Sequence, residues 1–199
     1  MNYKFLLPLT LLFFYLPGCE TTTPDGKVIN DDPEQNIEFL IQITRIAKDS
    51  KYMETCLKIV EEYGEKALPK LQKNLSNKYP KIRIACLYCI GEIYERTKSK
   101  KALELRPQIS RLLRDKLQRI RLEAASTLCT MGDYQGVPLL IQALRSDNAY
   151  VRCAALHVLF HTFEVDFGYD HQDKPEVREL RVRVWEEWWL KNKRQYLRS

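Results

Sequence analysis

The sequence predicts an all-α protein: a right-handed α-solenoid of about four stacked helix pairs with a C-terminal Trp-rich capping helix. Two observations lead to this fold class. Three segments of the chain share one pattern of apolar, proline and arginine positions, and tandem repeats of this length are typical of stacked helix pairs. The chain is also 45% hydrophobic and 29% charged, with only 7 glycines in 199 residues, which is typical of a globular, helix-rich protein.

The repeated segments begin at Ala67, Leu105 and Gly136. They read ALPKLQKNLSNKYPKIRIACLYCIGEIY, LRPQISRLLRDKLQRIRLEAASTLCTMG and GVPLLIQALRSDNAYVRCAALHVLFHTF. In each segment a proline is followed fourteen positions later by an arginine, and an aliphatic residue precedes that arginine. These positions are Pro69, Pro107 and Pro138, then Arg83, Arg121 and Arg152. Agreement at so many positions in three copies indicates a structural repeat.

Each copy predicts two helices joined by a turn. Proline suits the first turn of a helix, where its missing N–H costs nothing, and apolar residues then recur at helical spacing. A short polar break follows at Asn77, Asp115 or Asp147, and we interpret the repeat arginines as structural partners of such turn acids. The second helix carries small residues such as Ala85 and Ala124, which allow close helix approach. Since only a neighbouring pair can cover the apolar face of each pair, the pairs must stack.

This order of Pro, Leu-x-x-Leu, Asp, Val-Arg, Ala-Ala and Leu resembles HEAT repeats of the bacterial, phycobilisome-lyase-like type. The resemblance implies a repeat domain over residues 36–164. A degenerate first repeat fits NIEFLIQITRIA and YMETCLKIVEEYG, although it lacks the Pro and Arg positions. Arg83 and Arg121 are 38 residues apart, whereas Arg121 and Arg152 are 31 apart. The seven extra residues fall near ERTKSKKALEL and predict a basic extension or loop between two repeats.

Residues 165–199 predict a capping segment. An irregular stretch containing FGYD precedes a helical pattern, and together they look like the closing segment of some secreted bacterial HEAT proteins. Six apolar residues of this pattern fall near one face, namely Val177, Leu180, Val184, Trp185, Trp188 and Trp189. We favour a helix whose tryptophans seal the last repeat, because Trp is usually highly buried. The alternative is an aromatic platform that binds a sugar or a partner.

Residues 1–18 predict an export signal. Lys4 precedes an apolar run over residues 5–16, about half the roughly 20 residues that a membrane-spanning helix needs. The run ends in LPGC, which resembles the lipobox of bacterial lipoproteins, with Pro17 departing from the usual pattern. The resemblance implies that Cys19 is lipidated, becomes the first residue after cleavage and anchors the protein to a membrane. The alternative is an ordinary signal peptide or an uncleaved anchor.

Residues 19–35 predict a flexible tether, because they contain Thr, Pro, Gly and Asp but hardly any apolar residue. Residues 1–35 hold two lysines against five acidic residues, a net charge of −3, which leaves +9 on residues 36–199 of the total of +6. Such a basic body would be attracted to anionic lipid, an anionic polymer or an acidic partner. The sequence shows no nucleic-acid recognition motif, so nucleic acid is not an expected partner.

Chemistry-bearing residues form no catalytic motif: G-x-S-x-G, H-E-x-x-H and the P-loop do not occur. Cys86 and Cys89 have redox spacing, but Cys86 aligns with alanines of the other repeats, so we interpret it as a core thiol. His157 and His161 stand four residues apart, a spacing that can hold a metal. We favour metal-free surface histidines, because nothing fixes a third ligand. We therefore expect no catalytic residue, cofactor or metal.

A candidate partner-binding strip follows from the alignment. In a HEAT-like stack the second helices line the concave side, and positions one, five and nine residues after each repeat arginine share one helical face. With Tyr150 near the rim, the strip comprises Ile84, Tyr88, Glu92, Leu122, Ser126, Thr130, Tyr150, Cys153, His157 and His161. It mixes apolar residues with few charges, as expected of an interface core, and Lys81, Lys98 and Arg119 are candidates for a basic rim. Alternatively, these side chains fill a narrow groove and meet no partner.

The function that these features favour is a membrane-anchored, non-enzymatic scaffold of the bacterial cell envelope, on the periplasmic or outer surface side. It would bind an envelope protein or peptide. Two alternatives stay open. One is a structural envelope protein that binds an anionic polymer through its basic charge. The other is an accessory factor of an envelope enzyme, which the lyase-like repeat type suggests.

Overall fold

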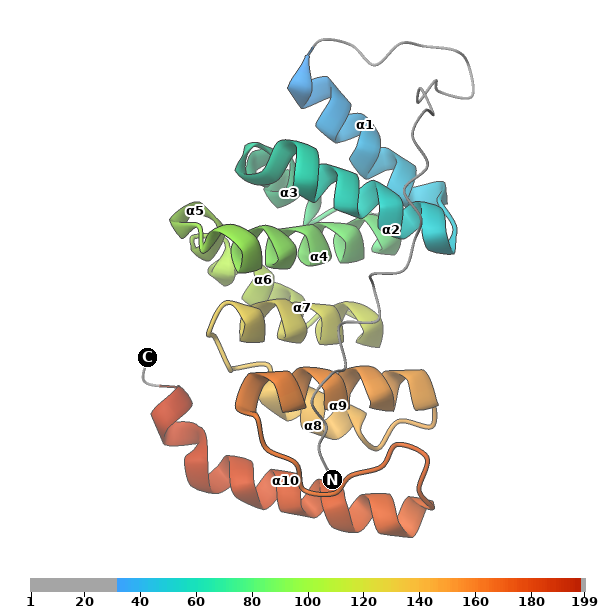
Figure 1. The fold of residues 1–199 in the computed structure, drawn as a ribbon, viewed down its shortest axis with the longest axis vertical. Coiled ribbons are helices and arrows are strands. Elements are labelled where there is room, and N and C mark those ends of the chain that lie inside the picture. The colour runs from blue at the N-terminus through green and yellow to red at the C-terminus, as the bar shows by residue number, and fades with distance from the viewer. Residues whose placement is uncertain (1–31, 198–199) are drawn as a thin grey trace, which may run out of the picture. The chain divides into compact units, whose positions relative to one another are not determined.

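The computed structural model describes residues 32–197, and helices account for most of this range (Figure 1). In chain order the elements are α1 (Pro33–Ile46), α2 (Asp49–Lys58), a π-helical turn η1 (Ile59–Tyr63), a 3₁₀ turn η2 (Gly64–Ala67), α3 (Leu68–Asn74), α4 (Pro80–Thr97), α5 (Lys100–Leu103), α6 (Arg106–Leu112), α7 (Gln118–Thr130), α8 (Val137–Ala143), α9 (Ala149–Phe163) and α10 (Pro175–Tyr196). The predicted all-α fold class is confirmed. The predicted signal, the anchor Cys19 and the tether as far as residue 31 lie outside the described residues.

The helices form four antiparallel pairs that follow one another from α1 to α9. Contacts join α1 to α2, α3 to α4, α6 to α7 and α8 to α9. The second helices also contact each other from pair to pair, α4 with α7 and α7 with α9 (Figure 1). The predicted solenoid of about four helix pairs is therefore confirmed. None of the helices between residues 32 and 197 combines the length and the apolar character that crossing a membrane requires.

The repeat pattern acts as expected inside each pair. A proline occupies the first turn of α3, α6 and α8, where its fixed φ suits the helix and no N–H is needed. In the second helices the residue seven positions after each repeat arginine is fully buried, and these residues are Ile90, Leu128 and Leu159. The degenerate first repeat follows the same logic, because Ile37, Leu40 and Ile41 at helical spacing are buried on one face of α1. This helix begins at Pro33, inside the range predicted as tether.

The repeat arginines fasten the turn between the two helices of a pair. In all three repeats the guanidinium donates a hydrogen bond to the backbone carbonyl six residues earlier. The pairs are Arg83 with Asn77 at 2.6 Å, Arg121 with Asp115 at 2.9 Å and Arg152 with Ser146 at 2.7 Å. The turns are thereby held by backbone acceptors that do not depend on which residue occupies the turn.

The predicted pairing of these arginines with turn acids holds for one acid and is wrong for the other. The Asp115 carboxylate forms an ion pair with Arg83 of the preceding repeat at 3.0 Å, and both side chains are nearly buried. Asp147 instead accepts a hydrogen bond from Arg152 through its backbone carbonyl, at 2.9 Å. The Asp147 side chain is exposed, so its carboxylate does not neutralise a buried arginine as that of Asp115 does.

The seven extra residues form an ordered extension between two repeats. Helix α4 continues to Thr97 and ends at Lys98, which has a left-handed conformation with φ of 50°. The short helix α5 follows and places Ala102 in the core. The predicted basic character is present in exposed lysines of this segment, while its apolar residues attach it to the stack.

Helix α10 closes the last repeat, as predicted, with contacts to α8. Val182, Trp185 and Trp189 form its buried face, and the Trp185 side chain is 0% exposed. The aromatic-platform alternative is therefore wrong for these two tryptophans, since a platform requires exposed rings. The predicted buried face was also partly wrong, because Val177, Leu180 and Val184 lie outside it and are exposed.

Candidate functional site

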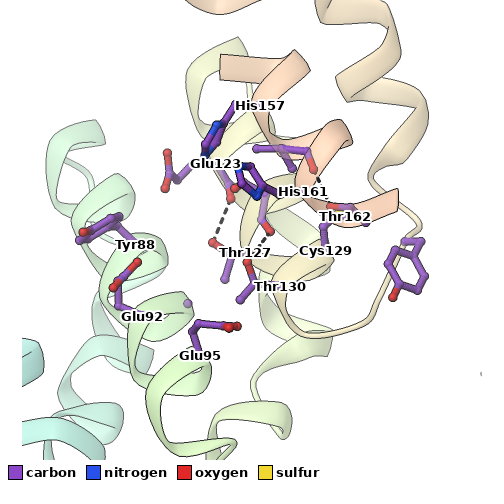
Figure 2. A pocket seen from close by; sticks show the side chains of 14 residues that line it. Tyr88, Glu92, Glu95, Glu123, Thr127, Cys129, Thr130, His157, His161 and Thr162 are labelled. Carbon is purple, nitrogen blue, oxygen red and sulfur yellow. Dashed lines mark hydrogen bonds between the residues drawn. The ribbon is translucent and has the colours of Figure 1, made fainter. Parts of the chain in front are cut away.

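A cavity of about 570 Å³ lies on the face that the second helices of three consecutive repeats form (Figure 2). Its lining comes from α4, α7 and α9, and from the turn after α7. The lining residues are Tyr88, Gly91, Glu92, Glu95, Glu123, Ser126, Thr127, Cys129, Thr130, Tyr134, His157, Val158, His161 and Thr162. The size falls in the range of pockets that hold small molecules or a few side chains.

Six of the ten residues of the predicted strip line this cavity. They are Tyr88, Glu92, Ser126, Thr130, His157 and His161. The other four lie elsewhere. Ile84 is 8% exposed and belongs to the core, contrary to the expectation that its position escapes it. Leu122 packs against the core of the last repeats, and Tyr150 and Cys153 are exposed on α9 away from the cavity.

The sequence alignment missed the floor of the cavity. Gly91 and Cys129 occupy equivalent positions, eight residues after the repeat arginine, and both are buried. A Cβ at Gly91 would lie 3.6 Å from Cγ2 of Thr127, so α4 and α7 approach closely there. The Thr127 hydroxyl donates to the Leu87 carbonyl across this contact at 3.2 Å. A glycine within an otherwise regular repeat helix was the available signal, because such a glycine often has a packing reason.

The charge of the cavity differs from the prediction of few charges. Glu92, Glu95 and Glu123 all line it. Glu92 is 3.8 Å from Arg96, and Glu95 forms an ion pair with Lys98 at 2.9 Å. Among the predicted rim residues, Lys98 therefore lies beside the cavity, whereas Lys81 donates to the Ala47 carbonyl. Three carboxylates therefore line the cavity of a basic protein, and two of them have a cationic side chain beside them.

Glu123 differs from the other two carboxylates. Its side chain projects from α7 into the space between Tyr88 on α4 and His157 on α9 (Figure 2). Burial raises the pKa of this carboxyl from 4.5 to about 7, and the nearby Arg119 charge lowers it only in part. No donor within residues 32–197 makes a hydrogen bond to the carboxylate, although the Glu123 backbone carbonyl accepts one from Thr127. Its negative charge is thus poorly compensated by the protein.

The two histidines of the predicted strip lie side by side on the wall of the cavity, with their ring planes tilted by 59°. Their ring centroids are 4.2 Å apart, and the pKa of His157 is lowered by burial and by the neighbouring His161. Within the part of the chain that the structure describes, no three His, Cys, Asp or Glu side chains are arranged to hold a metal ion. The two rings form a polar wall of the cavity, and the lowered pKa of His157 keeps that ring neutral near pH 7.

Potential nucleophiles of the cavity are not activated. The hydroxyls of Thr127, Thr130 and Thr162 each donate to a backbone carbonyl of their own helix. Burial raises the pKa of the Cys129 thiol to about 12, so thiolate is scarce at neutral pH. A nucleophile needs a neighbouring base or a lowered pKa, and these groups have neither. The arrangement favours binding over covalent chemistry.

Stacked helix pairs with a groove on the face of the second helices define an α-solenoid. Comparison with family models identifies its type: residues 105–181 match HEAT repeats, and residues 67–96 match a HEAT repeat. The chain is therefore a HEAT-repeat protein. The matched ranges contain every residue that lines the cavity. No curated protein matches the chain.

Proposed function

We propose that this protein is a membrane-anchored, non-enzymatic scaffold of the bacterial cell envelope that binds a segment of a partner protein in the cavity between α4, α7 and α9. The observation that carries the proposal is the position of this cavity. It spans the second helices of three consecutive HEAT repeats, and HEAT repeats suggest protein–protein interaction. A lining drawn from three helices offers a binding surface that no single repeat could form.

The surface chemistry supports a protein segment as the occupant. Tyr88 and Tyr134 provide aromatic contact area, and amphipathic aromatic residues are enriched in protein interfaces. Thr130, His157 and His161 are exposed at the opening, where a partner can reach them without unfolding the stack. A non-enzymatic role is supported by the occupied threonine hydroxyls and the protonated Cys129 thiol.

Membrane anchoring is supported by the LPGC motif at residues 16–19, which lies outside the described residues. Cys19→Ser should leave the precursor without lipid, because the acyl chains would be attached to the cysteine sulfur. Metabolic labelling with a radioactive fatty acid measures this directly. Labelled lipid on the Cys19→Ser variant, at the level of the unmodified protein, would overturn the anchor.

The binding site can be tested by site-specific photo-crosslinking in the producing cell. A benzophenone amino acid at Thr130, on the rim of the cavity, should give discrete cross-linked species, and peptide mapping should place the cross-link in one segment of one partner. Gln142 is the matched control, since it is exposed on α8, the first helix of its pair, and does not line the cavity. Equal cross-linking patterns from both positions would contradict the proposal.

The net charge favours a second candidate function, which is binding of an anionic envelope polymer. Residues 36–199 carry a charge of +9, which attracts such a polymer. Such binding would weaken steeply between low and physiological salt, because screening acts mainly on exposed charges. Binding in the partly buried cavity would depend less on salt. A titration of the captured partner at several ionic strengths separates the two functions.

A further inference from the structure

The most unusual group on the binding face is the Glu123 carboxylate. It is surrounded by three helices and is reached from the cavity, yet no described residue donates a hydrogen bond to it. A partly buried carboxylate without a donor is costly, because water has been removed and no protein group replaces it. Such a group is stabilised when a ligand supplies the missing donor.

The groups around Glu123 compensate its charge only in part: the charge of Arg119 lowers the pKa of the carboxyl less than burial raises it, and the nearby Tyr52 hydroxyl is buried without a hydrogen-bond partner in residues 32–197. The threonine hydroxyls of the cavity are occupied by backbone carbonyls, and the carboxylates of Glu92 and Glu95 are ion-paired with Arg96 and Lys98. Tyr88 presents an aromatic ring to the same space, and aromatic faces attract cations. The cavity therefore combines a carboxylate that accepts no hydrogen bond within the described residues with an aromatic ring that attracts positive charge.

We propose that the cavity binds a basic side chain, lysine or arginine, of the partner segment, with Glu123 as its counter-charge. This inference rests on the proposed function, in which a partner segment enters the cavity. Charge-assisted hydrogen bonds between a carboxylate and an ammonium or guanidinium group are stronger than neutral ones. The protein as a whole is basic, so the carboxylate of Glu123 selects where on its surface a basic segment can bind.

The proposed binding depends on pH through the groups that face Glu123. These are Tyr88, Glu92 and Glu95 from α4, Arg119 from α7, His157 and His161 from α9, and Tyr52 from α2. The pKa of Glu123, raised to about 7, means that the carboxyl loses its charge as the pH falls from 8 to 6. The pKa of His157 is lowered, so its positive charge develops later in the same direction. Affinity for a cation should therefore fall as the pH is lowered.

The test uses the protein itself and three synthetic peptides that differ from one another in one side chain. Acetyl-Gly-Gly-Arg-Gly-Gly-amide and its lysine analogue carry the cation, and the citrulline analogue keeps the shape of arginine without the charge. NMR titration would follow the ring signals of His157 and His161 at pH 8 and pH 6. We expect both cationic peptides to shift these signals at pH 8, with affinities at least about 10-fold higher than at pH 6. The citrulline peptide should bind at least about 10-fold more weakly than the arginine peptide.

Variants assign the effect to Glu123. Glu123→Gln should reduce the affinity for the arginine peptide at least about 10-fold. Glu187→Gln is the matched control, because it makes the same charge change at an exposed position of α10 and should leave the affinity for the arginine peptide unaltered. Ser126→Lys leaves Glu123 in place but supplies an internal ammonium three residues away on the same helix face, and it should also weaken binding. Circular dichroism checks that each variant is folded.

The outcomes separate this inference from the proposed function. Equal affinity for the citrulline and arginine peptides, or an unaltered affinity of Glu123→Gln, would overturn the cation site. If cross-linking from Thr130 still identified a partner segment, the proposed function would stand without it. If the arginine peptide bound through Glu123 but Thr130 cross-linked no partner, the cation site would stand and the scaffold function would be overturned.

Discussion

Helix α9 contacts two regions of very different character, both through its C-terminal half. On the side of the last repeat, α10 and the loop before it form an aromatic cluster in which Trp185 is fully buried and packs against Phe167 with ring centroids 4.7 Å apart. On the face of the second helices, the cavity is polar and leaves a carboxylate without a hydrogen-bond donor. The comparison shows that one set of repeats can form a closed, aromatic contact and an open, polar one.

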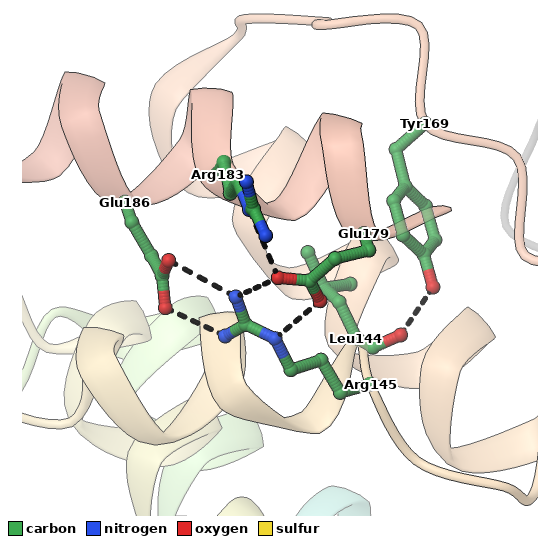
Figure 3. Close-up of polar contacts among 6 residues, drawn as sticks. All are labelled: Leu144, Arg145, Tyr169, Glu179, Arg183 and Glu186. Carbon is green, nitrogen blue, oxygen red and sulfur yellow. Dashed lines mark hydrogen bonds and ion pairs between the residues drawn. The ribbon is translucent and has the colours of Figure 1, made fainter. Parts of the chain in front are cut away.

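Charged side chains are hydrogen-bonded to one another at the capping helix, but the Glu123 carboxylate in the cavity is not. At the capping helix, Arg145 donates to the carboxylates of both Glu179 and Glu186, with closest distances of 2.7 and 2.6 Å (Figure 3). The Tyr169 hydroxyl donates to the Leu144 carbonyl beside this cluster (Figure 3). Glu123 has no comparable partner. Groups that are fully paired contribute to stability, whereas an unpaired group near a cavity is available for a ligand.

The largest expected effect concerns the closed contact. Trp185→Ala should lower the free energy of unfolding by about 3–5 kcal/mol, because it removes a large buried ring and leaves a cavity. Urea denaturation followed by circular dichroism measures the change. Leu190→Ala is the matched control, since Leu190 is 63% exposed on the same helix, and it should alter stability by no more than about 0.5 kcal/mol. Similar losses in both variants would show that α10 does not seal the last repeat through Trp185.

The second expected effect concerns the open cavity and has the opposite sign. The folded-state pKa of Glu123 is raised above 4.5, so its contribution to stability is greatest below about pH 4.5 and is lost as the pH rises toward 7. Glu123→Gln removes the buried charge and should stabilise the protein by about 1–3 kcal/mol at pH 8, with little effect at pH 5. Thermal melting at both pH values measures this. A destabilised variant at pH 8 would mean that the carboxylate has a partner.

The smallest expected effect concerns the paired charges of the capping helix. Hydrogen bonds from Arg145 lower the pKa of Glu179 to about 2, so the stabilisation is present above about pH 4.5 and is lost as the pH falls toward 2. All three side chains are about one third exposed or more, which limits the expected loss in Arg145→Met to less than about 1 kcal/mol at pH 7. The difference between Arg145→Met and the unmodified protein should vanish near pH 2. A constant difference over this range would assign the effect to packing of the arginine stem.

The sequence by itself determined the repeats, because stacking imposes the same local requirements on every copy. Pro69, Pro107 and Pro138 begin helices, Leu128 and Leu159 fill equivalent core positions, and the repeat arginines bond the turns. It also indicated six residues that line the cavity, since spacing of four keeps residues on one helical face. These features are periodic, and periodic features can be read from one chain.

Only the tertiary structure decided the features that break the period. The cavity exists where Gly91 and Cys129 bring small side chains together from two helices, and its charge comes from Glu123, two residues after a repeat arginine and outside the predicted row. The buried face of α10 was likewise set by the shape of the last repeat, which selects Val182, Trp185 and Trp189 and leaves Leu180 exposed. A residue's spacing gives the face of its own helix, but its burial and charge depend on which side chains the neighbouring helices place opposite it.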